Sequence, residues 1–229
     1  MTTVKGAWEL QDVRDKALAG IWKDYDSSGD PFTMFMWGRN TQGNLGQNNR
    51  TDYSSPVQVT GTTWSRMKSD GYATLANKVD GTLWAWGDNN KGQLGQNSPS
   101  NGDRSSPVQI GSDTTWSKVE ASYTGAFGIK TDGTLWGWGD NEYGQGGHNN
   151  QTEYSSPVQI PGTTWESVGN GTVWMAMATK TDGTLWTWGY NAVGQLGLND
   201  AIKYSSPVQI PGTNWKALTP GRQGRLVCI

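Results

Sequence analysis

Short runs in which apolar and polar residues alternate fill the chain from about residue 31 to its end, separated by clusters of Gly, Asp, Ser and Pro. In one run, TLWAWG, Trp84 and Trp86 lie on one face of an extended chain, and Leu83 and Ala85 lie on the other. The runs PVQI, TTWSKVEA and GAFGIK follow before the sequence returns to TLW. The pattern predicts four short strands in each unit of about 50 residues.

This unit occurs four times, and three markers recur in step. The first is SSPVQ, the second is WG followed one residue later by Asn, and the third is a Trp downstream of SSPVQ. These markers begin at Ser54, Ser105, Ser155 and Ser205, at Trp37, Trp86, Trp138 and Trp188, and at Trp64, Trp116, Trp165 and Trp215. A repeat of this length is one supersecondary unit, which buries its apolar surface by stacking on its neighbours.

An Asp-Gly pair precedes TLW at Asp80, Asp132 and Asp182. Asp-Gly between two apolar runs is the signal of a two-residue hairpin, because Gly accepts the positive φ of a type I′ turn. We therefore expect the last strand of one repeat to pair antiparallel with the first strand of the next.

The predicted fold class is all-β, a β-propeller of about four blades with four antiparallel strands in each blade. Most of the 14 Trp residues recur at fixed repeat positions, so we assign them to packing between blades. The recurring Gly residues are assigned to turns and close approaches of the backbone.

The two ends of the repeat region are complementary. Pro31–Asn40 matches only the TLW strand of a repeat, and the C-terminal KALTPGRQGRLVCI matches only the strands before it. We expect the strand with Leu226 and Cys228 to pair with the strand Thr33–Trp37 of the same chain, so that the ends close the ring. The alternative is pairing between chains, which builds a larger ring or a fibre.

Taken together, WGDNNKGQLG, SSPVQI and DGTLW resemble the repeat of the regulator of chromosome condensation family. The resemblance covers roughly residues 31–229. It implies β-propellers that are usually seven-bladed, and the family includes an exchange factor for a small GTPase, secreted β-lactamase inhibitory proteins, and many bacterial and phage proteins. The present chain departs from the family in having only four repeats, so one copy cannot close a seven-bladed ring.

Composition excludes several classes of function. The net charge is −2, and Lys and Arg form no cluster, so we expect no nucleic-acid binding. No apolar run approaches the length of a membrane span. The one Cys excludes an internal disulfide framework. The N-terminus lacks the basic and apolar regions of a secretory signal, which predicts a product assembled in the cytoplasm.

Residues 1–30 are interpreted as a separate attachment segment, and residues 31–229 as the propeller. Glu9–Ala19 has the apolar spacing of a short amphipathic helix. The segment GAWELQDVRDKALAGIW also resembles the opening of structural proteins encoded by marine phages. We therefore expect it to dock on other structural proteins; the alternative is a helix that covers the propeller's own face. The candidate attachment residues are Trp8, Leu10, Val13, Ala17, Ile21 and Trp22.

Catalytic and metal-binding constellations are missing from the sequence. The single His, His148, is interpreted as a solvated loop residue, and no Cys or His cluster accompanies it. The recurring Asp residues belong mostly to turns. We expect no enzyme activity, no cofactor and no metal.

Two sets of loop residues vary between the repeats and are candidates for binding. Rigid aromatic and long basic side chains are common at contact surfaces, and the alternative is that these side chains are merely solvated. The set after GQLG contains Arg50, Tyr53, Arg104, Tyr154, Lys203 and Tyr204, and the set near the third and fourth strand runs contains Tyr72, Tyr123 and Trp174.

The sequence therefore predicts a non-enzymatic structural and interaction module. The favoured hypothesis is a virion surface component, such as a tail or head fibre or a decoration protein, made in the host cytoplasm. Its N-terminus would attach it, its loops would meet a host-surface protein or glycan, and it could form homo-oligomers. The alternative is a regulatory protein-binding propeller of the exchange-factor or enzyme-inhibitor type.

Overall fold

The computed structural model describes residues 32–70, 72–98, 102–172, 174–215, 218–219 and 227–228. Within these ranges the chain is all-β and has three four-stranded antiparallel sheets and two two-stranded sheets. The predicted helix at Glu9–Ala19, with its attachment residues, lies outside the described residues.

Each four-stranded sheet is one blade, and its strands follow chain order. The first blade contains β3 (Trp64–Asp70), β4 (Ala73–Lys78), β5 (Leu83–Gly87) and β6 (Arg104–Gln109). The second contains β7 (Trp116–Ala121), β8 (Gly125–Lys130), β9 (Leu135–Gly139) and β10 (Tyr154–Ile160). The third contains β11 (Trp165–Thr172), β12 (Met175–Lys180), β13 (Leu185–Gly189) and β14 (Tyr204–Ile210). The predicted four strands per blade are confirmed for these three.

A two-stranded half-blade precedes the three complete blades in chain order, and another follows them. β1 (Phe35–Gly38) pairs with β2 (Tyr53–Gln58), and β15 (Leu218–Thr219) pairs with β16 (Val227–Cys228). The first strands of successive blades contact one another, β3 with β7, β7 with β11, and β11 with β15. These strands therefore form the inner side of the arc, and β6, β10 and β14 form its outer side.

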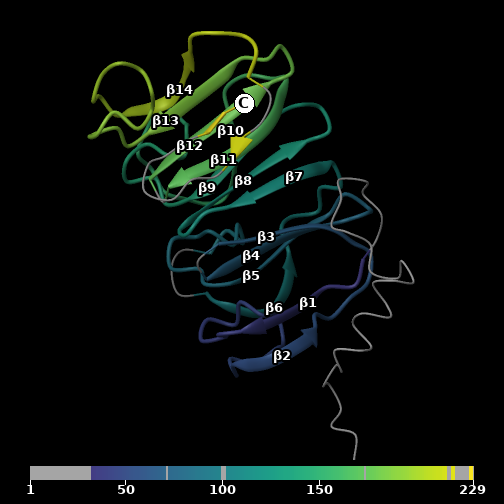
Figure 1. Ribbon diagram of the computed structural model, residues 1–229. Coiled ribbons are helices and arrows are strands. Elements are labelled where there is room, and N and C mark those ends of the chain that lie inside the picture. The colour runs from purple at the N-terminus through teal and green to yellow at the C-terminus, as the bar shows by residue number, and fades with distance from the viewer. Residues whose placement is uncertain are drawn as a thin grey trace, which may run out of the picture.

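Closure of the ring within one chain was predicted, and this prediction is wrong. Among the described strands, β1 pairs with β2 and β16 pairs with β15, but β1 and β16 do not pair with each other. Figure 1 shows β1 and β2 at one end of the row of blades and β13 and β14 at the other. The rotation from blade to blade is set by side-chain packing, and the described repeats do not turn far enough to pair β1 with β16.

Blades are joined by the second Trp of each WxWG strand. The Trp138 indole of the second blade donates a hydrogen bond of 2.9 Å to the Gln93 carbonyl in the preceding repeat. Gly95 lies against the same indole at a φ of +66°, and a Cβ there would lie 3.1 Å from Trp138 Nε1. Trp86 and Trp188 repeat the bond, to the carbonyls of Asn44 at 2.9 Å and Gln145 at 2.8 Å. The prediction that recurring Trp residues pack between blades is confirmed at these positions.

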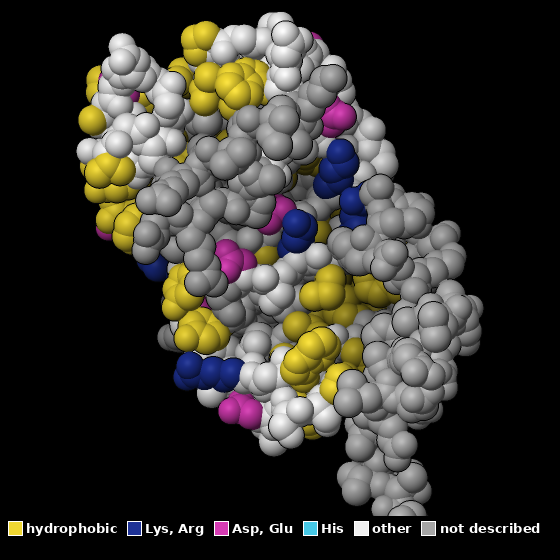
Figure 2. All heavy atoms as spheres, viewed as in Figure 1, with side chains coloured by type: hydrophobic (Ala, Val, Ile, Leu, Met, Phe, Trp, Pro, Cys, Tyr) yellow, Lys and Arg dark blue, Asp and Glu magenta, His cyan; other side chains and the backbone are white. Residues whose placement is uncertain are grey.

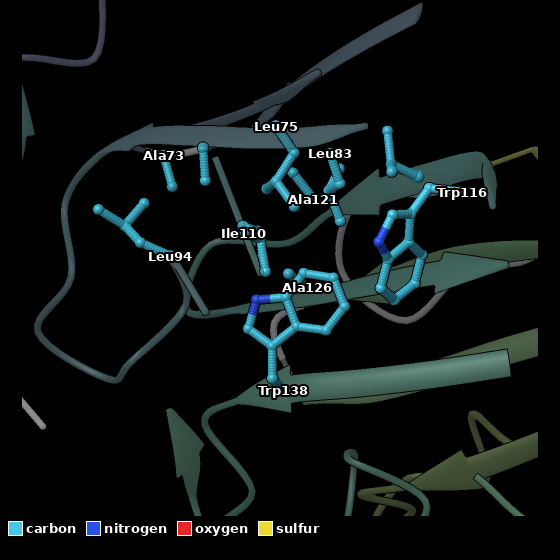
Figure 3. Close-up of a cluster of buried hydrophobic side chains, with 11 residues drawn as sticks. Ala73, Leu75, Leu83, Leu94, Ile110, Trp116, Ala121, Ala126 and Trp138 are labelled. Carbon is cyan, nitrogen blue, oxygen red and sulfur yellow. The ribbon is translucent and has the colours of Figure 1, made fainter. Parts of the chain in front are cut away.

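Apolar side chains of two blades fill the space around each such indole. Figure 3 shows Trp138 pointing from β9 toward Ala126 and Ile110. Leu75 and Leu83 of the first blade belong to the same buried cluster. The core of this protein is thus a series of interfaces between repeats rather than one central mass.

The Asp-Gly hairpins exist, but their turn type differs from the prediction. In the β4–β5 hairpin Gly81 has a φ of +78°, whereas Asp80 is not among the described residues with positive φ, as a type I′ turn would require. Gly81 N–H donates to the Lys78 carbonyl, and Lys78 N–H donates to the Thr82 carbonyl, both at 3.0 Å. The loop therefore has three residues and ends in a left-handed Gly. Asp80 Oδ1 stabilises it by accepting hydrogen bonds from the backbone N–H and the hydroxyl of Thr82.

A Lys at the end of β4, β8 and β12 lies over two Trp rings. Lys130 Nζ is 3.9 Å from the Trp136 ring centroid and 4.9 Å from that of Trp116. It also forms an ion pair of 2.5 Å with Asp113, which holds the pKa of that carboxyl at about 2. Lys78 and Lys180 repeat the cation–π contacts in the other two blades.

Replacing Trp138 by Ala should lower the free energy of unfolding by about 3–5 kcal/mol, because a large cavity opens between two blades. Trp174→Ala, at a turn residue that is 45% exposed, should cost far less. Chemical denaturation of both variants measures the difference, and an equal loss in both would contradict the role of Trp138 as the joint.

Asp113→Asn tests the ion pair with Lys130. Because the folded-state pKa lies below its usual value, the carboxylate stabilises the fold at pH 7, and this stabilisation disappears as the pH falls from about 4 to about 2. We expect the substitution to cost about 1 kcal/mol at pH 7, since solvent screens a partly exposed pair. Melting curves should converge near pH 2, and a gap that stays constant with pH would rule out this charge effect.

Candidate interaction face

Both variable sets of residues lie at the same end of the blades. In the first blade Gly87 pairs with Ala73 at the start of β4 and with Arg104 at the start of β6. The inner turn β3–β4 and the long loop β5–β6 therefore emerge together, and the other two blades repeat this register. We call this end, with the inner turns and the loops that follow β1, β5, β9 and β13, the loop face. The sequence indicated two variable sets and did not predict whether they lie together.

One buried Asn holds each long loop in shape. Asn141 Nδ2 donates to the carbonyls of Thr152 at 2.9 Å and Asn150 at 3.1 Å, while its Oδ1 accepts from Gly146 N–H at 2.7 Å. The equivalent residues of the other repeats are Asn40, Asn89 and Asn191, all fully buried. In the sequence these Asn residues served only as a repeat marker. Their recurrence in all four copies was the signal that they hold the loops in shape.

The predicted contact tyrosines of the outer loops brace their own loops. Tyr53 and Tyr154 accept hydrogen bonds from Asn49 at 2.9 Å and Asn150 at 3.1 Å. Tyr204 donates to Asp200 Oδ2 at 2.9 Å. All three rings are half-buried, so part of each ring remains open to a partner.

The predicted basic residues do not gather. Arg50 forms an ion pair of 3.2 Å with Asp103 across two repeats, while Arg104 and Lys203 are exposed. In the view of Figure 2, hydrophobic side chains form separate patches, and the Lys and Arg side chains lie apart, close to Asp or Glu. Asp88 is buried beside Asp103, and burial, followed by the charge of Asp103, raises the pKa of Asp88.

The inner turns bring aromatic side chains together. Tyr72 and Tyr123, from adjacent blades, have ring centroids 5.7 Å apart, and the Arg39 guanidinium lies 5.8 Å from the Tyr72 centroid. Arg39 was not among the predicted contact residues. Tyr123 is 43% exposed.

A second aromatic group, which we call the aromatic trio, consists of Tyr143, Trp174 and Tyr190. The Tyr143 centroid lies 4.9 Å from that of Tyr190 and 5.6 Å from that of Trp174, and the Trp174 and Tyr190 centroids are 5.7 Å apart. The negative charge of Glu142 raises the pKa of the Tyr143 hydroxyl. Only Trp174 was predicted, since Tyr143 and Tyr190 belong to other loops and meet it through the fold.

His148 is not the solvated residue that was predicted. Its Nε2 lies 3.0 Å from the Val158 carbonyl, and its ring packs edge-on against Tyr154. Burial lowers its pKa.

The described part of the chain contains no group of three or more His, Cys, Asp or Glu residues that could hold a metal ion. Nor does any helix in that part have the length and apolar character needed to span a membrane.

Comparison with known proteins places these features in a family. The family model of the "Regulator of chromosome condensation (RCC1) repeat" matches residues 33–69, 80–128, 132–171 and 182–218. A second model of that repeat matches residues 116–145. A search of curated proteins gave no significant match.

Solved structures share the fold at low sequence identity. Human WBSCR16 superposes with a TM-score of 0.72 at 21% identity, covering 84% of this chain and 54% of its own. Prp20p from Saccharomyces cerevisiae gives 0.73 at 19% identity, with 84% and 52% covered. Yeast RCC1 (Prp20) in complex with Kap60 gives 0.71 at 15% identity, with 85% and 51% covered. The chain thus spans about half the length of these proteins.

Asn141→Ala should lower the free energy of unfolding by about 3 kcal/mol, because it leaves several buried backbone groups without partners. Hydrogen exchange should rise throughout the loop that joins β9 to β10. Glu142→Ala, at the exposed neighbouring position, provides the control. Unchanged exchange in the Asn141 variant would show that the loop holds its shape without this side chain.

Proposed function

Because the chain belongs to the RCC1 repeat family, we propose that it is a non-enzymatic protein-interaction module that binds a protein partner through its loop face. The observation that carries the proposal is the aromatic trio. Tyr and Trp contribute most to many protein interfaces, because they bury large rigid surfaces at low cost in conformational entropy. Trp174 remains 45% exposed although it contacts both tyrosines.

The chemistry around the trio favours a basic side chain of the partner. Glu142 is exposed beside Tyr143, and its charge reaches the Tyr143 hydroxyl. An Arg or Lys inserted here would meet aromatic faces and a carboxylate together, which combines cation–π attraction with an ion pair. Tyr72 and Tyr123 extend the aromatic surface along the inner turns of the first two blades.

The structural relatives are compatible with a protein partner. Prp20p has binding properties toward Gsp1p and histones, and a second structure contains yeast RCC1 (Prp20) bound to Kap60. A regulatory binding role would use the same loop face. The virion surface role rests on the leader at residues 1–30, outside the described residues, and stays a prediction, as does assembly in a host cytoplasm.

The proposal is tested by selecting peptides from a random display library on the immobilised full chain. We expect the selected peptides to be rich in Arg or Lys, and Trp174→Ser to weaken them about thirtyfold or more. Glu142→Gln should weaken them less, about fivefold, because the aromatic contacts remain.

Val79→Ser provides the matched control, since Val79 is 48% exposed at the opposite end of the blades. Peptides that bind the Trp174 variant as well as they bind the unmodified chain would place the binding surface elsewhere. Peptides without basic residues that still require Trp174 would keep the face but refute its preference for a cation.

A further inference from the structure

We propose that the two ends of the arc form a binding site for a second copy of this chain, so that two copies associate head to tail into one ring. The first-repeat edge, comprising Trp37 and Ser54 on β1 and β2, docks on the last-repeat loop, residues 191–204, of the other copy. This inference is independent of the partner proposed for the loop face.

The three internal joints show what a filled interface looks like. Gly92 lies so close to Ser155 of the next repeat that a Cβ would be 2.8 Å from the Ser155 Cα. Asn97 N–H donates to the Ser155 carbonyl at 2.7 Å. The same bond runs from Asn48 to Ser105 at 2.6 Å and from Asn149 to Ser205 at 2.7 Å. Every joint therefore uses one Ser, two loop glycines and the buried indole.

The first-repeat edge presents the indole and the Ser of such an interface to solvent. Trp37 occupies the position of Trp86, Trp138 and Trp188, which are at most 3% exposed, yet Trp37 is 61% exposed. Ser54 is exposed as well, whereas Ser105, Ser155 and Ser205 are half-buried.

The last-repeat loop has the glycines that receive an indole and a Ser in the other repeats, but among the described residues no indole or Ser lies against them. Gly194 and Gly197 are exposed, whereas their equivalents in the three other repeats are buried. Among the described residues, a Cβ on Gly197 would meet only Ile210 within 4 Å, whereas one on Gly147 would lie 2.9 Å from the Trp188 indole. Ile210 is only half-buried, although Ile110 and Ile160 at the same position are buried. Asn199 keeps the same left-handed backbone, with a φ of 60°.

The half-blades are complementary in the same sense. β15 and β16 are the two inner strands of a blade, and β1 and β2 are the two outer strands. Pairing β16 of one copy with β1 of the other completes a four-stranded sheet and covers two open edges. Among the described strands β1 and β16 do not pair with each other within one chain, so a second copy can supply the missing half of each blade.

The lengths of the matching proteins agree with two copies. The matches cover 84–85% of this chain but only 51–54% of each matching chain, so two copies together span about the length of one matching chain. Two copies would make eight blades, three complete blades from each chain and two shared ones, which lies within the range of four to eight seen in propellers.

Sedimentation or light scattering of the full chain over a concentration series tests the proposal. We expect a dimer at micromolar concentration that dissociates on dilution. Trp37→Ala should weaken association about thirtyfold or more, by the scale of aromatic anchors at interfaces. Ser54→Arg should do the same by blocking the approach to Gly194. Both residues are exposed in the single chain, so circular dichroism and thermal melting at dilute concentration should be unchanged.

A substitution that is expected to raise the affinity between the two copies gives an independent test. Lys91 pairs with Glu153 of the next repeat at 2.6 Å, and the aligned residues at the open ends are Val193 and Asp52. Val193→Lys should strengthen the dimer about two- to fivefold at low salt, and added salt should remove the gain. A monomer at every concentration, a ladder of larger oligomers, or a dimer indifferent to Trp37→Ala and Ser54→Arg would overturn the proposal.

Discussion

The contact between a buried indole and the glycine-containing loop of the preceding repeat holds the blades of this protein together. A single four-stranded sheet of this size buries too little apolar surface to be stable alone. The indole of Trp138 fills the space between two sheets and also satisfies the Gln93 carbonyl. Gly95 makes this possible, since a side chain at its left-handed φ would be strained and would crowd the ring.

The same loops that receive the indoles form the loop face. Asn141 holds the loop after β9 from inside, and this loop carries Tyr143 to the side of Trp174 and Tyr190. Packing on the inner side of a loop therefore fixes the position of the aromatic residues on its outer side. Residues as different as Tyr143, Lys91 and Val193 occupy the same position of this loop in three repeats, whereas the residue that follows them is Gly in each.

The sequence was sufficient to predict the strands, the repeat and the packing role of residues such as Trp86, because each leaves a local and periodic pattern. The direction of the strands also implied that the two variable sets lie at the same end of the blades, but this was not predicted from the sequence. Ring closure could not be predicted, since the angle between blades arises from three-dimensional packing around the indoles. The turn type was missed because Asp80 bonds to Thr82 instead of adopting a positive φ. Nor did the sequence bring Tyr143 to Trp174, which are far apart along the chain.

Hydrogen exchange of the indole N–H groups, followed by NMR over a range of protein concentrations, is the most direct test of the joint between repeats. We expect slow exchange at Trp86, Trp138 and Trp188 at every concentration, because each donates to a loop carbonyl between repeats. At Trp37, identified by its loss in Trp37→Phe, exchange should be fast in dilute solution and become slow as the concentration rises. Fast exchange at Trp138, or protection of Trp37 that does not depend on concentration, would contradict this role of the indoles.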